Sequence, residues 1–238
     1  MSKIKLIAFD LDGTLTQHKT PLSPVNKAIL DRLKENYILL MVGAGDSMRI
    51  FNQMGKYPID IYGNYGLQLG KYNDRTGKLD LVVNQSLPCD RNSVSARITM
   101  LREKYGFTEY AGENAEFHDS GVVTFPLLGT KANAAEKIAF DPDRSKRRAF
   151  YQDVIDTFFE YEVFIGGSSS FDLAPKPYNK YYAMNAYCEK LGIGHDEAVF
   201  VGDDYGPGGN DESVYRSDFG FVKVDDYTKL GEALKDYL

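Results

Sequence analysis

An apolar segment that ends in two aspartates constrains the fold of this chain more than any other feature. Residues 3–9 read as a buried strand, and Asp10 and Asp12 follow it, ahead of a Gly-Thr turn. Because side chains alternate along a strand, both carboxylates leave the sheet on the same side, where the strand stops. Ligands bind at this edge of open α/β sheets, and Mg²⁺ prefers carboxylate and phosphate oxygens. The motif therefore indicates metal-assisted phosphoryl chemistry, and the alternative is a solvated turn after an edge strand.

A second apolar segment ends in the same way near the other end of the chain. Residues 198–201 lead into a Gly-Asp-Asp sequence that contains Asp203, and a glycine-rich loop follows at 205–211. Two parallel strands that both end in aspartates can arrange these carboxylates around one ion. We therefore predict Asp203 as a third metal ligand, beside Asp10 and Asp12. Glycine lets the loop backbone approach a metal or a phosphate closely, although a turn-rich loop without a function would have the same composition.

The order of the expected elements divides the chain into a core and an insertion. Strands and helices alternate in the first third and again after residue 179, which is typical of a doubly wound parallel sheet. The part between them has two expected helices and several strands without this alternation. We therefore predict an α/β fold with a doubly wound parallel-sheet core of residues 1–83 and 179–238. An α+β cap of residues 84–178 is inserted into this core.

Two helices carry predictions of which residues are buried. The first begins at Ser23, a favourable N-cap, and its apolar spacing predicts that Val25, Ile29 and Leu33 face the core. The second is expected over 146–160 in the cap. Its first three residues are basic, and we interpret them as a solvated helix face.

Composition argues against several classes of function. The 28 basic and 34 acidic residues give a formal net charge of −6, and nothing in it points to a nucleic-acid or membrane partner. No segment reads as a signal peptide or a membrane span. Cys89 and Cys188 are far apart and lack metal-ligand spacing, which favours reduced thiols in a cytoplasmic protein. A Gly-x-Gly-x-x-Gly pattern is absent after the first strand, so a nucleotide-binding protein has little support.

The order of these features resembles the haloacid dehalogenase (HAD) superfamily of phosphotransferases. The resemblance spans nearly the whole sequence and includes Lys180, which begins the expected helix between the cap and the second acidic strand end. It implies that Asp10 is the nucleophile that accepts the phosphoryl group. Asp12 would be the general acid, with its backbone carbonyl on Mg²⁺, while Asp203 completes the metal site and Lys180 steadies Asp10 and the phosphate. Physical chemistry agrees, because a carboxylate that attacks a phosphate dianion needs positive charge nearby.

A closer resemblance within that superfamily is to the eukaryotic-type phosphomannomutases. Four segments of this sequence carry it: 10–16, 42–46, 164–172 and 202–211. The resemblance implies substrate contacts from Gly45, where the family has a phosphate-binding serine, and from the nearby Ser47. It also implies contacts with a sugar hydroxyl from Ser170 and Asp172 in the cap.

The cap positions that hold the remote phosphate in the mutases differ in this chain. The mutases use arginines, whereas His118, Thr130 and Lys137 stand there, and Lys137 is the expected substrate contact. Arginine supplies a planar, permanently charged fork that neither His nor Thr replaces. We therefore expect a Mg²⁺-dependent phosphatase that acts on a small phosphorylated metabolite, in particular a sugar phosphate. The alternatives are a phosphomannomutase with Lys131, Lys137 or Arg144 as the remote clamp, and a non-catalytic sugar-phosphate sensor.

The resemblance also implies a homodimer that forms through the cap. An expected helix that carries Val94, Ile98 and Leu101 offers an apolar face for this contact. The same face could instead belong to the core of the cap.

Overall fold

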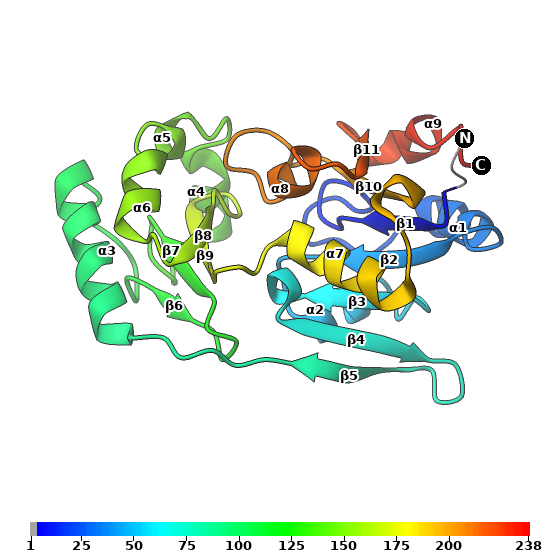
Figure 1. Cartoon of the computed structure of the whole chain (residues 1–238). Coiled ribbons are helices and arrows are strands. Elements are labelled where there is room, and N and C mark those ends of the chain that lie inside the picture. The colour runs from blue at the N-terminus through cyan, green and yellow to red at the C-terminus, as the bar shows by residue number, and fades with distance from the viewer. Residues whose placement is uncertain (1–3) are drawn as a thin grey trace. The chain divides into compact units, whose positions relative to one another are not determined.

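The computed structural model describes residues 4–238, which form two compact units (Figure 1). Of the described residues, 4–85, 179–207 and 211–238 form the core unit, and 86–178 and 208–210 form the cap unit. In the colours of Figure 1, the blue, cyan, yellow and red parts of the chain make up most of the core unit, and the green part makes up most of the cap unit.

The core unit is built on one seven-stranded sheet. The strand order is β11-β10-β1-β2-β3-β4-β5, with parallel pairing from β11 to β3 and antiparallel pairing of β4 and β5 at one edge. The strands are Leu6–Phe9 (β1), Ile38–Val42 (β2), Asp60–Gly63 (β3), Gln68–Asn73 (β4), Lys78–Asn84 (β5), Ala198–Gly202 (β10) and Gly220–Lys223 (β11). This mostly parallel sheet confirms the predicted α/β fold class. It follows from the apolar segments at β1, β2 and β10, which are almost entirely buried.

Helices cover both faces of this sheet. They are α1 (Pro24–Leu33), α2 (Ser47–Gln53), α7 (Lys180–Leu191), α8 (Glu212–Tyr215) and α9 (Leu230–Ala233). Side chains of α1, α2 and α9 join one hydrophobic cluster, and side chains of α7 and α8 join another. Along β1, Ile7 and Phe9 belong to the first cluster and Leu6 and Ala8 to the second, as the two-residue period of a strand requires. The core unit is therefore a three-layer α/β structure.

Helix α1 begins where predicted, and two of its three predicted core residues, Ile29 and Leu33, pack in the core. The Ser23 Oγ caps it by accepting a hydrogen bond from the Asn26 N–H at 3.1 Å. Val25 is 67% exposed, whereas Asn26, Leu30 and Leu33 are buried, so the prediction for Val25 is wrong. Asn26 faces inward because its Nδ2 donates to two backbone carbonyl groups, at 2.8 and 3.0 Å. The spacing of apolar residues cannot predict that a polar residue such as Asn26 is buried by its hydrogen bonds.

The cap unit contains a four-stranded antiparallel sheet with the strand order β6-β7-β9-β8. The strands are Glu116–Phe117 (β6), Val123–Pro126 (β7), Tyr161–Phe164 (β8) and Ser170–Pro175 (β9). Helices α3 (Arg91–Tyr105) and α6 (Tyr151–Thr157) share a hydrophobic cluster with one face of this sheet. Val94, Ile98 and Leu101 of α3 are at most 2% exposed. This helix face therefore belongs to the core of the cap and is not available to a second copy of the chain.

The second half of the cap differs from its prediction. Residues 146–160 form two short helices, α5 (Ser145–Arg148) and α6, and a further helix, α4 (Ala134–Phe140), precedes them. Arg147 is 1% exposed, so the interpretation of the basic segment as a solvated face is wrong at this residue. Its Nε lies 2.7 Å from Asp141 Oδ2, in an ion pair that ties α5 to the end of α4.

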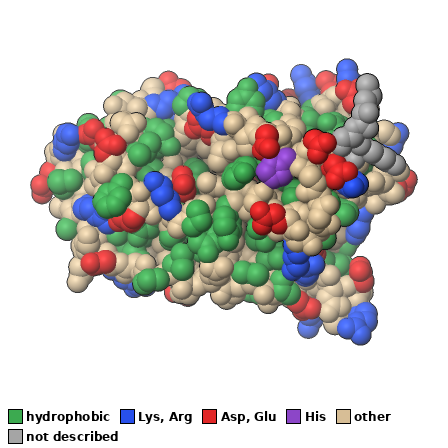
Figure 2. Space-filling view, viewed as in Figure 1, with side chains coloured by type: hydrophobic (Ala, Val, Ile, Leu, Met, Phe, Trp, Pro, Cys, Tyr) green, Lys and Arg blue, Asp and Glu red, His purple; other side chains and the backbone are tan. Residues whose placement is uncertain are grey.

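The surface carries charges of both signs. Figure 2 shows acidic and basic side chains interspersed with hydrophobic ones over the face in view. Among residues 4–238, no helix combines the length and the apolar character needed to cross a lipid bilayer.

Candidate active site

Three carboxylates meet at the carboxyl edge of the core sheet. Asp10 follows β1, and Asp203 and Asp211 lie in the segment after β10, with one carboxylate oxygen of each within 4.8 Å of the others. Parallel pairing produces this proximity, because Phe9 is aligned with Val201 across β1 and β10. The residues that follow leave the sheet side by side, where the strand-end argument expects Asp10 and Asp203. We refer to these three aspartates as the carboxylate cluster.

Lys180 supplies positive charge to the carboxylate cluster. It is the first residue of α7, after the N-cap Asn179, and its side chain is fully buried. Its Nζ donates hydrogen bonds to Asp10 Oδ1 at 2.5 Å and to Asp211 Oδ1 at 2.7 Å. Burial alone would lower the pKa of Lys180, but the negative charges of Asp10 and Asp211 outweigh burial and raise that pKa. The lysine is therefore a fixed cation.

The carboxylate cluster holds more negative than positive charge. Burial raises the pKa of Asp10 well above its usual value, although Lys180 opposes this shift. Burial, with the charge of Asp211, also raises the pKa of Asp203 to about 6. Three carboxylates and one ammonium group leave an excess of negative charge in a largely buried space. A hard divalent cation suits such a set of oxygen donors, so these residues fit Mg²⁺.

Asp211 is a member of this cluster that the sequence analysis did not assign to the site. Its side chain is fully buried, and its Oδ2 accepts a hydrogen bond from the Asp204 backbone N–H at 3.0 Å. Its Oδ1 accepts from Lys180, so Asp211 holds both the lysine and the loop that carries Asp203. The aspartate was visible in the sequence, but the direction of a loop side chain cannot be read from periodicity.

The Asp12 carboxylate lies outside this cluster. Its Oδ1 accepts hydrogen bonds from the Lys19 backbone N–H and from Gln53 Nε2, both at 2.7 Å. Its Oδ2 lies 3.9 Å from His18 Nδ1 and 4.0 Å from Arg49 Nη1. The strand-end argument, which placed this carboxylate around the ion with Asp10 and Asp203, is therefore wrong for Asp12. The resemblance assigned the metal contact of Asp12 to its backbone carbonyl, which leaves the side chain for the proposed acid role. Gln53 is not among the site residues that were predicted from the sequence.

The Gly-Thr turn after Asp12 is built against Asp203. The Thr14 Oγ1 donates a hydrogen bond to Asp203 Oδ1 at 2.8 Å. Gly13 has a φ of +103°, which other residues rarely adopt, and a Cβ at this position would overlap the Asp203 carboxylate. Both residues of the turn therefore fix the position of Asp203.

The two predicted substrate contacts after β2 have different environments. Gly45 is partly exposed, and a Cβ there would overlap the guanidinium of Arg49. Ser47 begins α2 and is fully buried, with its N–H donating to Gln68 Oε1 at 3.0 Å. Within the described part of the chain, the Ser47 hydroxyl has no hydrogen-bond partner. A substrate contact from Ser47 stays a prediction, while Arg49 is a cation beside Gly45 that the sequence analysis did not consider.

Ser170 and Asp172 lie on the polar face of the cap sheet. They alternate along β9 with buried residues of the cap cluster, so they point to the other face. Thr124 Oγ1 donates a hydrogen bond to Asp172 Oδ1 at 3.1 Å, and the same Thr124 Oγ1 lies 3.2 Å from His118 Nε2. Ser170 Oγ donates to the Gly166 carbonyl at 3.0 Å. The polar face therefore carries a connected set of hydrogen-bonding side chains.

Three basic side chains of the cap donate hydrogen bonds to its backbone. Lys137 in α4 is partly buried, and its Nζ donates to the Thr130 carbonyl at 3.4 Å. Arg147 Nη1 donates to three carbonyl groups within residues 166–170, at 2.7, 3.2 and 3.1 Å. Arg102 is 2% exposed and donates to backbone carbonyl groups, two of them at 3.0 and 2.9 Å. These two guanidinium groups stabilise the cap itself.

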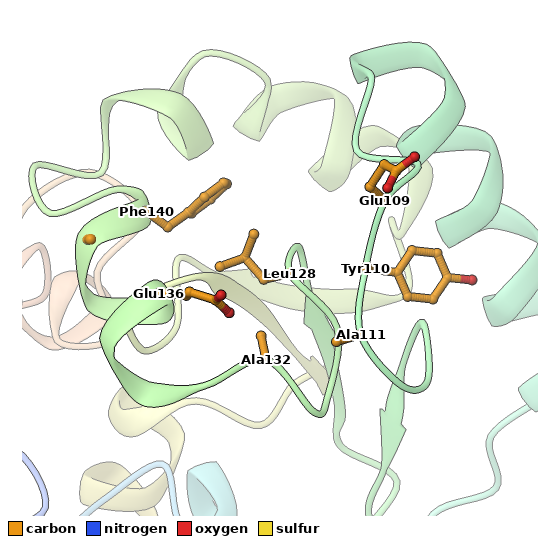
Figure 3. A pocket seen from close by; sticks show the side chains of 8 residues that line it. Glu109, Tyr110, Ala111, Leu128, Ala132, Glu136 and Phe140 are labelled. Carbon is orange, nitrogen blue, oxygen red and sulfur yellow. The ribbon is translucent and has the colours of Figure 1, made fainter.

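The cap unit also has a pocket of about 450 Å³. Figure 3 shows Glu109 and Tyr110 on one side of it and Glu136 and Phe140 on the other, with Leu128 between them. Three alanines complete the lining. The described lining residues include two carboxylates and no basic side chain, so the pocket is unsuited to a phosphate group.

The sequence matches known proteins over most of its length. A profile of the family described as "Eukaryotic phosphomannomutase" matches residues 26–229. This span contains Lys180, Asp203 and Asp211, while Asp10 and Asp12 precede it. The phosphomannomutase of wheat, Triticum aestivum, is 28% identical over 228 residues, which cover 90% of this chain and 86% of the wheat protein.

Two solved structures share the fold. An N-terminally truncated IMP-nucleotidase of Plasmodium falciparum has a TM-score of 0.73 and 15% identity, covering 99% of this chain and 70% of that protein. A phosphatase of the HAD superfamily from Bacteroides thetaiotaomicron has a TM-score of 0.62 and 16% identity, covering 99% and 96% of the two chains. Since the family profile spans most of the sequence, this chain belongs to the eukaryotic phosphomannomutase family.

Proposed function

We propose that this protein is a phosphomannomutase that moves a phosphoryl group between the 1- and 6-hydroxyl groups of a hexose phosphate. The family match supports isomerisation over the hydrolysis that the sequence analysis ranked first. The observation that carries the proposal is the buried pairing of Lys180 with Asp10, next to Asp203 and Asp211. A carboxylate held beside a fixed positive charge is what phosphoryl transfer to a carboxylate requires.

The first half-reaction forms an aspartyl phosphate. A carboxylate oxygen of Asp10 attacks phosphorus, and the bond between phosphorus and the sugar oxygen breaks. The released oxygen takes a proton from Asp12. Lys180 offsets the negative charge that the phosphate brings to Asp10.

The second half-reaction reverses these roles. Asp12 takes the proton of the attacking hydroxyl group, and the phosphoryl group passes from Asp10 to that oxygen. With a hexose phosphate as acceptor, the product is a bisphosphate, which rebinds in the other orientation and returns its first phosphoryl group to Asp10. With water as acceptor, the product is inorganic phosphate, and the reaction is hydrolysis.

Mg²⁺ is the proposed cofactor, held by Asp10, the Asp12 backbone carbonyl and Asp203. The donors are all oxygen atoms, and the carboxylates carry more charge than Lys180 offsets. When bound, the ion neutralises negative charge on the phosphoryl group during transfer. A homodimer through the cap stays a prediction, with its surface outside the buried face of α3.

Hydrolysis is a second candidate because of the cap. A mutase must hold the remote phosphate of its bisphosphate, yet Arg102 and Arg147 are buried against backbone carbonyl groups. A mutase with this cap would depend on Lys131, Lys137 or Arg144 for the clamp, and two of these three are lysines. Lysine binds phosphate as a point charge and not as a fork, so this clamp would be weaker than arginines.

One assay distinguishes the two candidates. The protein is supplied with Mg²⁺, mannose 1-phosphate and a catalytic amount of a hexose bisphosphate, and the products are followed by ³¹P NMR. Conversion to mannose 6-phosphate without inorganic phosphate is expected. Stoichiometric release of inorganic phosphate would instead establish the phosphatase, and Asp10→Asn should abolish either reaction. If the protein turned over no member of a broad panel of phosphorylated substrates, and Asp10→Asn left ligand binding unchanged, the protein would be a non-catalytic sugar-phosphate sensor.

A cap variant tests the clamp separately. Lys137→Ala should suppress isomerisation and spare the release of phosphate from p-nitrophenyl phosphate, which has no remote phosphate to hold. Equal losses in both reactions would contradict the role of Lys137 as a clamp.

A further inference from the structure

Gln53 connects the Asp12 side chain to two other parts of the core unit. It is the last residue of α2, and its Nε2 donates to Asp12 Oδ1 at 2.7 Å and to the Thr20 carbonyl at 3.1 Å. Its Oε1 accepts a hydrogen bond from Arg49 Nη1 at 2.9 Å. The side chain therefore uses both ends of its amide, one towards a carboxylate and the other towards a guanidinium.

The orientation of this amide is fixed by its neighbours. If it were turned end for end, its oxygen would face the oxygens of Asp12 and Thr20, and its NH₂ group would face Arg49. Neither contact is favourable, because a carboxylate and a carbonyl have no proton to give and a guanidinium accepts none. Gln53 therefore always presents a donor to Asp12.

The same contacts give the two oxygens of Asp12 different roles. Oδ1 also accepts from the Lys19 N–H at 2.7 Å and from Thr16 Oγ1 at 3.4 Å, so it is held by both α2 and the loop after β1. Oδ2 lies 3.9 Å from His18 and 4.0 Å from Arg49, beyond hydrogen-bond distance. The carboxylate is fixed through Oδ1 and keeps Oδ2 for a group of the substrate.

We infer that Gln53 is a positioning residue for phosphoryl transfer, which orients Asp12 so that Oδ2 meets the leaving oxygen of the substrate. This inference rests on the proposed function, in which Asp12 gives that oxygen a proton. Proton transfer needs hydrogen-bond reach between the two groups, and a misplacement of about 1 Å can lower a rate roughly 10²-fold. Loss of Gln53 should therefore affect only leaving groups that need the proton.

Two substrates with different leaving groups distinguish this role from a structural one. A hexose phosphate releases an alkoxide that needs a proton, whereas p-nitrophenyl phosphate releases a stabilised phenolate. For both, kcat/KM reports the steps up to the aspartyl phosphate. Gln53→Ala should lower kcat/KM for the hexose phosphate by roughly 10- to 100-fold and for p-nitrophenyl phosphate by less than about threefold.

Two further variants serve as controls. Because Gln53 acts through Asp12, adding Gln53→Ala to Asp12→Asn should cause no further loss with the hexose phosphate. Asn52→Ala changes the exposed neighbour in α2 and should leave both substrates unaffected. Equal losses for the two substrates in Gln53→Ala, or additive losses in the double variant, would overturn the inference.

A crystal structure of Gln53→Ala tests the inference independently of turnover. The Asp12 carboxylate is expected to rotate away from the Lys19 N–H, and an unchanged carboxylate would contradict the positioning role. An inactive wild-type protein would reject the proposed function, and the carboxylate orientation in the variant would still decide the role of Gln53.

Discussion

Lys180 is sealed from solvent and owes its charge to two carboxylates. Removing it would leave Asp10, Asp203 and Asp211 facing one another without compensation. We expect Lys180→Ala to abolish phosphoryl transfer and to lower the free energy of unfolding by about 3–5 kcal/mol. Lys190→Ala, on the exposed part of the same helix, should change it by less than about 0.5 kcal/mol. Chemical denaturation measures both, and equal stability of the two variants would contradict the compensating role.

Asp10→Asn should separate activity from stability. An amide cannot replace the attacking carboxylate, so phosphoryl transfer should fall by about 10³-fold or more. Burial raises the pKa of Asp10, which means that the folded protein disfavours its charged form. In metal-free buffer, the free energy of unfolding should therefore stay constant or rise. A large loss of stability would instead show that the pairing with Lys180 outweighs burial.

The sequence predicted individual site residues where a strand sets their direction. Asp10 and Asp203 follow buried strands, and the parallel pairing of these strands brings their carboxyl ends to one edge of the sheet. Asp211 and Gln53 could not be found in this way, because their contacts depend on the course of a loop and on the end of a helix. The burial of Arg147 likewise depends on its carboxylate partner, which only the folded cap supplies.

At the scale of elements, Arg147 joins α5 to the segment before β9. Its guanidinium binds Asp141 and the carbonyl groups of residues 166–170, next to the predicted sugar contact Asp172. A lysine cannot make this set of hydrogen bonds. Arg147→Lys should lower the stability of the cap by roughly 1–3 kcal/mol and raise KM for a hexose phosphate. Arg148→Lys, at an exposed position of the same helix, should do neither.

Denaturation and steady-state kinetics test this pair of variants. Retained stability and an unchanged KM in Arg147→Lys would show that the segment is held by other contacts. Loss of stability with an unchanged KM would limit Arg147 to the core of the cap.

Elements could be predicted where their limits depend on local chemistry. The start of α1 follows from its cap residue, Ser23. The buried face of α1 instead depends on the distant partners of Asn26. The division of residues 146–160 into two helices accompanies the burial of Arg147, and no local pattern contains that information.

At the scale of the whole molecule, the carboxylate cluster makes stability depend on pH. Burial raises the pKa of Asp203 to about 6 in the folded protein, against about 3.9 in an unfolded chain. Such a group stabilises the fold fully below its unfolded pKa, and this contribution is lost as pH rises through its folded pKa. In metal-free buffer, the contribution of Asp203 to the unfolding temperature should therefore fall between about pH 4 and 7.

Mg²⁺ should raise the unfolding temperature again near neutral pH, because an ion that binds only the folded state stabilises that state. Asp203→Asn should weaken both the pH dependence and the response to Mg²⁺. Asp74→Asn, in the exposed turn of the β4–β5 hairpin, should change neither. Thermal unfolding with Mg²⁺ and with a chelator measures these effects. A wild-type response to Mg²⁺ in Asp203→Asn would remove this residue from the metal site.

The alignment of Phe9 with Val201 makes the carboxylate cluster sensitive to the number of residues in β1 and β10. Deleting one residue from β10 would shift the strand by half its repeat and turn Asp203 towards the opposite face, with every functional group still encoded. Lengthening the hairpin tip at 73–77 would disturb no such alignment. Evolution can therefore change the length of this hairpin tip, whereas within β1 and β10 it is confined to exchanging one side chain for another.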